Sequence, residues 1–254
     1  MTGSLISTLG TARLTGCPAP LPAWDVPLGE AYGLQKALFA ERGVPLAGWK
    51  IGLTGEGIRK ALGADSPAAG QLAPADIVRA PERAAIGRGE FYVEGELIFE
   101  IGERLSPTGS PFTPAQVANV VAGLHVGIEL VTSRFASTDL PLGLLVADNC
   151  MADRLLVGDR VATGWEDRFA DMAITLRGPG DAITRGATSA VMGNPLLAVV
   201  WLADWLAERG MALEAGQFIS SGTCTGVTAV APGDRVSVDL SGLGGAGVEF
   251  TAGS

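Results

Sequence analysis

The sequence predicts an α+β fold dominated by β-structure, and its composition supports that class. Of the 254 residues, 47% are apolar and 18% are charged, which is enough to bury a sizeable core and argues against disorder. The 36 glycines and 15 prolines indicate many tight turns, as in folds built from short strands. We therefore expect one domain over residues 1–254, with a partly helical N-terminal segment at 1–45.

Helical and strand-like segments alternate through the first half of the chain. Residues 28–43 have helical spacing and end at a glycine, and 46–53 is typical of a short buried strand. A helical turn or two is expected at 55–62. The stretch 63–88 is rich in Gly, Pro and Ala and is predicted to be a long loop with a turn. Residues 91–102 carry aromatic and branched side chains and predict a strand.

The second half of the chain begins with a capped helix and ends in strands. Thr113 as the N-cap, Pro114 as the first helical residue and Gln116 completing a capping box predict a helix that opens at 113–124. A second helix is expected over 194–210, from an Asn-Pro start to a glycine stop. The other strand-like stretches are a strand at 125–131, a hairpin at 172–186 and strands broken by turns over 226–250.

Charge and targeting signals exclude several classes of protein. The net charge of −9 disfavours nucleic acid and anionic lipid as partners. Cys17, Cys150 and Cys224 are widely spaced without a CxxC, so neither a disulfide framework nor a zinc knuckle is expected. The N-terminus lacks a secretory signal, and the apolar run "PLLAVVWLA" is too short to span a bilayer. We expect a soluble cytoplasmic protein.

Two acids in the middle of an apolar strand are the main chemical signal. Glu94 and Glu96 in "FYVEGELIFEIG" lie two residues apart, so both point to one face, about 7 Å apart along the chain. A solvated strand face is the simple explanation. If they are buried, their pKa values rise unless a cation compensates. Mg²⁺ or Mn²⁺ would do so with oxygen ligands, and Glu129 in "VGIELV" is the candidate third ligand.

Two further polar groups interrupt apolar segments. Lys50 lies inside the short strand of "AGWKIGLT", where a cation is costly unless it is paired. It is either an edge residue that reaches solvent, or a cation that binds an anionic substrate or moves a proton. Asp148 and Asn149 follow an apolar run in "LLVADNCM" and form either a turn or part of a site.

Three motif-like features do not fit the functions that their patterns suggest. "GLGGAG" at 242–247 matches a dinucleotide-binding pattern but lacks the helix and acid that should follow, so a turn is predicted. "GTCTG" around Cys224 imitates a nucleophile elbow, yet a Val-rich strand follows it and no histidine lies downstream. The single histidine, His125, is expected to be structural.

The order of these segments resembles the 2-keto-4-pentenoate hydratase and 4-oxalocrotonate decarboxylase branch of the fumarylacetoacetate hydrolase superfamily. The matching segments, within residues 28–250, are "AGWKIGLT", "VEGELIFEIG", "GIELVTSRF", "VADN", "GNPLLAVVWLADWLAERG", "FISSGTCTG" and "VAPGDRV". The resemblance implies a β-rich mixed β-sandwich or roll with peripheral helices and a Mg²⁺ or Mn²⁺ site.

The resemblance also implies roles for particular residues when it is carried over by position. The metal ligands would be Glu94, Glu96 and Glu129, and the catalytic residues would be Lys50 and Asp148. Contacts to a small 2-oxo or 2-hydroxy carboxylic acid would come from Gly52, Asn149 and Thr223. The resemblance also implies a homo-oligomer, with a complex with a sister hydratase or decarboxylase as the alternative.

The pattern of many hydratases is broken at two places. Ala68 stands where an acid follows the proline of "DSPAAG", and Cys150 with Met151 replaces the small residues that follow "ADN". The predicted activity is metal-dependent addition of water to a 2-hydroxy-dienoate or 2-oxo-enoate, giving a 4-hydroxy-2-oxo acid. The alternatives are decarboxylation of a 2-oxo-enedioate, hydrolysis of a β-dicarbonyl acid, and a catalytically silent subunit that binds a small acid.

Overall fold

A computed structural model describes residues 2–80 and 83–253 and contains two mixed β-sheets. The larger sheet has seven strands in the order β2-β1-β10-β5-β6-β7-β3, and the smaller has five in the order β4-β12-β11-β8-β9. The strands are β1 Gly48–Gly52, β2 Ala68–Leu72, β3 Ile77–Arg79, β4 Arg83–Ile86, β5 Phe91–Ile101, β6 Val121–Thr132, β7 Ala152–Ala162, β8 Ala173–Arg177, β9 Ile183–Ala187, β10 Phe218–Val230, β11 Arg235–Leu240 and β12 Gly245–Ala252.

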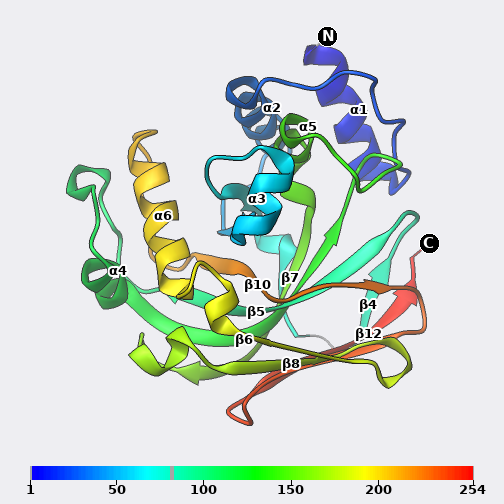
Figure 1. The fold of residues 1–254 in the computed structure, drawn as a ribbon. Coiled ribbons are helices and arrows are strands. Elements are labelled where there is room, and N and C mark those ends of the chain that lie inside the picture. Colours follow the sequence, from blue (N-terminus) through cyan, green and yellow to red (C-terminus); the bar gives the residue numbers. More distant parts are fainter. Residues whose placement is uncertain (1, 81–82, 254) are drawn as a thin grey trace.

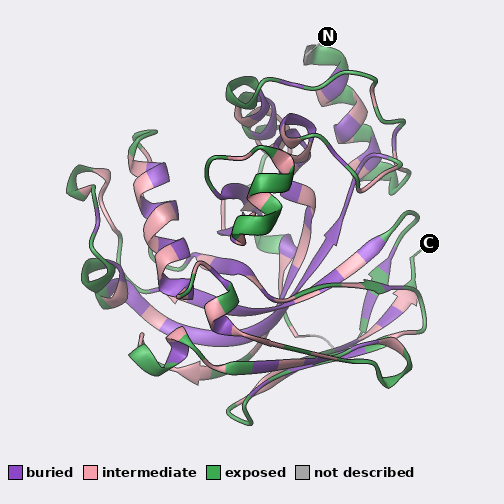
Figure 2. Ribbon diagram, viewed as in Figure 1, coloured by how far each residue is buried: buried purple, intermediate pink, exposed green. Residues whose placement is uncertain are grey.

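Helices cover the face of the larger sheet that the smaller sheet leaves free (Figure 1). They are α1 Thr2–Thr15, α2 Leu28–Glu41, α3 Glu56–Leu62, α4 Pro114–Val120, α5 Leu142–Ala147 and α6 Pro195–Ala207. The smaller sheet packs against β6 through β11 and β12. Since both faces of the larger sheet are covered, its central strands are almost wholly buried (Figure 2). A polar side chain on these strands therefore needs a specific partner.

Most of the predicted elements are present. Asn194 caps α6 with its side chain, and the Thr113 and Gln116 capping box at α4 forms as expected. The hairpin is β8 paired with β9. Turns separate β10, β11 and β12 near the predicted breaks. The α+β, β-rich architecture is thus confirmed.

Two predictions of local structure were wrong. The stretch 63–88 is not a long loop, because β2, β3 and β4 lie within it. Small residues made this stretch resemble a loop, but they serve close packing: a Cβ on Gly70 would lie 2.6 Å from the Asn149 carbonyl oxygen. The helix opening at Thr113 ends at Val120, because β6 begins at Val121 and pairs with β5.

One helical stretch of the described chain, Thr188–Ala207, is long and apolar enough to cross a membrane. Half of it is buried inside the fold, and its regular part, α6, has 13 residues. α6 packs against α4 and β10, and Trp205 on it contacts the rings of Tyr32 and Trp49 at centroid distances of 5.0 and 5.9 Å. These contacts are those of a core helix.

Candidate metal centre and cavity

β5 and β6 bring the three predicted metal ligands together. Their antiparallel register pairs Glu94 directly with Glu129, and Glu96 follows two residues later on the same face. A Cβ on the intervening Gly95 would contact Val238 of the smaller sheet, so the carboxylates point to the helix-covered side. One carboxylate oxygen from each glutamate lies within 4.8 Å of the others.

Several oxygens of this cluster form no hydrogen bond to another described residue. Oε2 of Glu96 accepts hydrogen bonds from the Ser220 hydroxyl and, at 3.0 Å, from the Gly222 amide. Oε1 of Glu96 and both carboxylate oxygens of Glu129 are buried without a hydrogen bond. Unsatisfied buried carboxylate oxygens are costly, whereas a hard divalent cation takes such oxygens as ligands. The donor set therefore fits Mg²⁺ or a similar divalent ion.

The electrostatics of the cluster support the same interpretation. Burial, together with the facing Glu129 carboxylate, raises the pKa of Glu94 to about 7, although the Lys50 ammonium opposes this rise. Burial also raises the pKa of Glu96 well above its usual range, and the carboxylates of Glu129 and Glu94 add to that effect. Without a cation the cluster retains protons near neutral pH, and a bound divalent cation would displace them.

Lys50 reaches this cluster from a distant strand. Two strands, β10 and β5, separate β1 from β6, so the chains of β1 and β6 would lie about 14 Å apart in a flat sheet. Nevertheless Nζ of Lys50 lies 3.2 Å from Oε1 of Glu129, because the sheet curves around the site. The contact is an ion pair without hydrogen-bond geometry. Burial lowers the pKa of Lys50, but the carboxylates of Glu129 and Glu94 outweigh it and raise the pKa above its usual range.

A cavity of about 710 Å³ opens above this cluster. Lys50, Gly52, Glu94 and Thr223 all line it, so the structure brings together four of the predicted site residues. The other two ligands are buried next to Glu94. α3 borders the cavity and contains no buried residue, as the exposed colouring of this helix shows (Figure 2).

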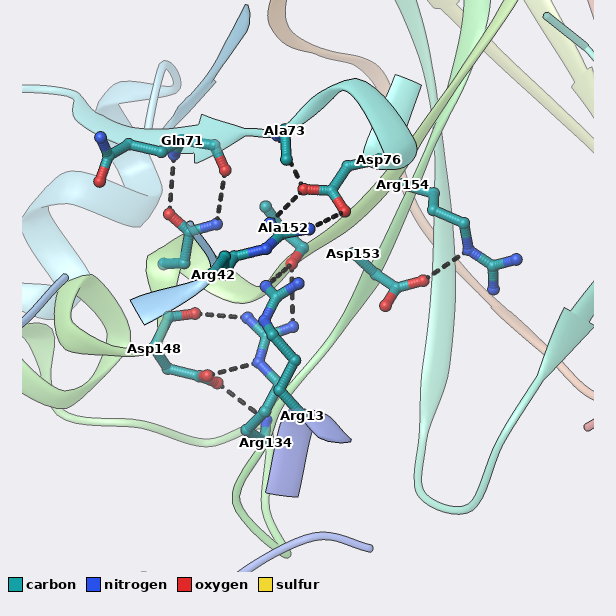
Figure 3. Close-up of polar contacts among 11 residues, drawn as sticks. Arg13, Arg42, Gln71, Ala73, Asp76, Arg134, Asp148, Ala152, Asp153 and Arg154 are labelled. Carbon is teal, nitrogen blue, oxygen red and sulfur yellow. Dashed lines mark hydrogen bonds and ion pairs between the residues drawn. The ribbon is translucent and has the colours of Figure 1, made fainter. Parts of the chain in front are cut away.

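Asp148 and Asn149 are not among the residues that line this cavity, and the Asp148 carboxylate points to Arg134 (Figure 3). The Asp148 carboxylate accepts hydrogen bonds from Nε of Arg134 at 2.6 Å and from its main-chain amide at 2.9 Å. The Asn149 side chain exchanges two hydrogen bonds, at 2.7 and 2.9 Å, with the main chain of Gln71. Both residues line a separate cavity of about 160 Å³ that also contains Arg13. The predicted catalytic role of Asp148 and the predicted substrate contact of Asn149 therefore find no support in this geometry.

The ion pair explains why a charged Asp148 is tolerated in the interior. Burial raises the pKa of Asp148, while the Arg134 guanidinium opposes that rise. The Arg134 guanidinium also donates to the carbonyl oxygen of Ala152 at 2.9 Å. Asp148 thus fixes the turn between α5 and β7, directly before the cavity-lining residues Cys150 and Met151.

Three residues that shape the cavity wall were not predicted to do so: Leu53 was not singled out, and Cys150 and Met151 were noted only as departures from the hydratase pattern. Leu53, Cys150 and Met151 line the cavity and have φ angles of 58°, 52° and 60°, which are uncommon for residues other than glycine. Burial raises the pKa of Cys150 to about 12, so its thiol is neutral. Ser220, which holds Glu96, was also missed. The signals were present, since these residues lie in or directly beside "AGWKIGLT", "VADN" and "FISSGTCTG".

The three motif-like features are structural. Cys224 is buried inside β10, and burial raises the pKa of its thiol above its usual range. Residues 242–247 form a turn and the start of β12. His125 is buried, with Nε2 lying 3.1 Å from Oε2 of Glu100.

Comparison with known proteins agrees with this fold. Residues 66–250 match the family described as fumarylacetoacetate (FAA) hydrolase C-terminal. The chain is 31% identical over 260 residues to a 2-keto-4-pentenoate hydratase of Burkholderia vietnamiensis, covering 98% of this chain and 97% of that protein. It is 30% identical over 235 residues to a 4-oxalocrotonate decarboxylase of Pseudomonas putida, covering 89% and 86%.

A solved structure extends the likeness to the whole fold. The 4-oxalocrotonate decarboxylase from Pseudomonas putida G7, complexed with magnesium and adipate, has a TM-score of 0.87 at 26% identity, covering 98% of this chain and 97% of that one. A second structure of that decarboxylase is complexed with calcium and acetate. The fold and its three-glutamate site thus define a β-rich protein with a centre suited to a divalent cation.

The chain belongs to the fumarylacetoacetate hydrolase family. Within that family, its relatives include enzymes named as hydratases and enzymes named as decarboxylases.

Proposed function

We propose that the protein is a divalent-metal-dependent hydratase. It adds water to a 2-hydroxy-dienoate, or to the 2-oxo-enoate tautomer, and gives a 4-hydroxy-2-oxo acid. The observation that carries this proposal is the set of carboxylate oxygens on Glu96 and Glu129 that are buried without a hydrogen bond, beside Lys50 and Glu94 at a cavity. Relatives named as 2-keto-4-pentenoate hydratases support it at 31 to 32% identity.

Glu94, Glu96 and Glu129 would hold Mg²⁺ or Mn²⁺. When bound, the cation would stabilise negative charge that develops on the oxygen at carbon 2 of the substrate. The Lys50 ammonium lies at the same cavity. It donates a hydrogen bond to that oxygen or transfers a proton to the carbon skeleton of the substrate. Gly52 and Thr223 line the cavity and contact the substrate.

Decarboxylation of a 2-oxo-enedioate is the second candidate function. It is favoured by the likeness to the Pseudomonas putida G7 decarboxylase, and it would use the same metal site. Hydrolysis of a β-dicarbonyl acid and a silent binding subunit are further alternatives. We also propose a soluble cytoplasmic homo-oligomer, with a complex with a sister hydratase or decarboxylase as the alternative assembly.

The deciding experiment uses the purified, metal-stripped chain. Mg²⁺ is restored, 2-hydroxypenta-2,4-dienoate is added, and the diene absorbance is followed together with the mass of the product. We expect absorbance to be lost only with metal, and the product to be heavier by one water. Release of CO₂ from 4-oxalocrotonate without hydration of the dienoate would favour the decarboxylase. Two carboxylic fragments from a β-dicarbonyl acid would indicate a hydrolase. No turnover of any of these substrates by a protein that binds Mg²⁺ would favour the silent binding subunit.

A further inference from the structure

The cavity above the metal centre has an unequal distribution of charge. Among the residues that line it, the charged ones are Lys50, Glu94 and Asp139. Lys50 is already paired with Glu129 at 3.2 Å, and Asp139 is exposed and negative. Among the described residues, the cavity lining therefore holds one cation, Lys50, and it lies at the metal end.

Arg59 on α3 lies close to the cavity, but its guanidinium is bound to the main chain. Its Nη1 donates hydrogen bonds to the carbonyl oxygens of Leu53 and Thr54 at 2.8 and 2.7 Å. These bonds hold the guanidinium against the main chain at the start of α3, and Arg59 is not among the lining residues. A carboxylate at the far end of a substrate would lose water there without gaining a cationic partner.

The remaining wall is mainly apolar. Six of its side chains come from five separate elements or loops and are Leu53, Ile58, Leu62, Leu145, Met151 and Val227. Ile58 on α3 and Val227 on β10 are 49% and 64% exposed, although both border a site with a charged floor. Exposed apolar side chains that converge on a cavity are suited to contact with an apolar ligand group.

The cavity is large enough for a ligand bigger than a five-carbon acid. Its volume of about 710 Å³ lies in the range of roughly 300–1,000 Å³ that is typical for drug-sized ligands. A five-carbon dienoate bound at the metal end would leave much of the apolar wall uncovered.

We propose that this cavity selects a 2-oxo monocarboxylic acid, or its 2-hydroxy-dienoate form, with an extended uncharged apolar tail. It discriminates against an acid with a second carboxylate at the far end. The inference rests on the proposed function and specifies its substrate class. The head group lies at Lys50 and the metal ligands, and the tail packs against Ile58, Leu145 and Val227.

Binding of saturated 2-oxo acids to the Mg²⁺-loaded protein tests the inference without requiring turnover. Calorimetry would compare 2-oxopentanoate, 2-oxohexanoate and 2-oxooctanoate. Each added methylene should tighten binding by up to about fourfold, because each buried methylene contributes about 0.8 kcal/mol. 2-Oxoadipate has the carbon count of 2-oxohexanoate with a carboxylate at its end, and it should bind at least about tenfold more weakly.

A pair of variants tests whether the apolar wall is responsible. Ile58→Lys introduces a cation on α3, where no residue is buried, and it should reduce or reverse the preference for 2-oxohexanoate over 2-oxoadipate. Ile183→Lys is the matched control, since Ile183 is 42% exposed on β9 and does not line the cavity. It should leave the preference unchanged.

The outcomes distinguish a failure of the tail inference from a failure of the proposed function. Equal affinity of the unmodified protein for 2-oxoadipate and 2-oxohexanoate, or no gain with tail length, would overturn the tail inference while leaving the hydratase proposal intact. If Ile58→Lys left the preference for 2-oxohexanoate over 2-oxoadipate unchanged, the assignment of this preference to the apolar wall would be overturned. Failure of every 2-oxo acid to bind in the presence of Mg²⁺ would overturn the proposed function itself, and the tail inference with it.

Discussion

The stability of the metal-free protein should depend on pH through the carboxyl group of Glu94. Its pKa rises from the ordinary 4.5 to about 7 on folding, mainly because of burial. The folded chain therefore keeps a proton that the unfolded chain releases between these two values. The resulting stabilisation is fully present below about pH 4.5 and is lost as pH rises through about 7.

The size of this effect follows from the same two values. A pKa rise of about 2.5, at about 1.36 kcal/mol per pH unit, lowers the free energy of unfolding by on the order of 3 kcal/mol across that window. A saturating divalent cation binds the deprotonated cluster and should reverse the trend. Mg²⁺ at about 100 times its dissociation constant would add about 2.7 kcal/mol at pH 8, and much less at pH 5.

Urea titrations from pH 4.5 to 8, with chelator and with Mg²⁺, measure both effects. Glu94→Gln is the matched variant, because it keeps the shape of the side chain and removes its titration. The metal-free variant should lose the part of the pH dependence that belongs to Glu94. The reasoning is refuted if the unmodified and variant proteins show the same slope without metal, or if Mg²⁺ stabilises the protein equally at pH 5 and pH 8.

Three further substitutions separate the roles of residues around the site. Glu129→Gln should weaken Mg²⁺ binding by at least about tenfold in calorimetry and lower activity in parallel, because it removes a charged oxygen ligand; full metal affinity would contradict the ligand assignment. Lys50→Met should retain Mg²⁺ binding but lower kcat by about 100-fold, and an unchanged rate would make this lysine structural. Arg134→Met should reduce the free energy of unfolding by about 3–5 kcal/mol, because a buried carboxylate loses its partner; a change below about 1 kcal/mol would contradict that role.

Local patterns predicted the secondary structure where side-chain chemistry and backbone geometry agree. The capping box at Thr113 and the Asn194 cap are decided within a few residues, so both helix starts could be located from the sequence. The stretch that contains Gly70 could not be assigned in this way. Its small residues are required by a neighbour distant in the chain, the carbonyl of Asn149, and a composition of that kind is otherwise typical of loops.

Some residues of the site could be predicted from the sequence with less help from the structure than others. The side-chain period of a strand by itself places Glu94 and Glu96 on one face. Glu129 was a candidate because it is a lone acid in an apolar strand-like run, but its pairing with Glu94 depends on the register of β5 and β6, which spacing along the chain does not determine. The resemblance to a family placed Asp148 in the site, but its carboxylate is bound by Arg134 outside the cavity.

The sequence by itself determined the β-rich class, the oxygen-only ligand types and the acid pair on one face. Only the tertiary structure decided which charges meet. Lys50 reaches Glu129 because the sheet curves across the two strands between β1 and β6, and curvature is a property of the packed sheet rather than of either strand. The apolar wall likewise combines Ile58, Leu145 and Val227 from three elements, which become neighbours only when helices pack over that curved face.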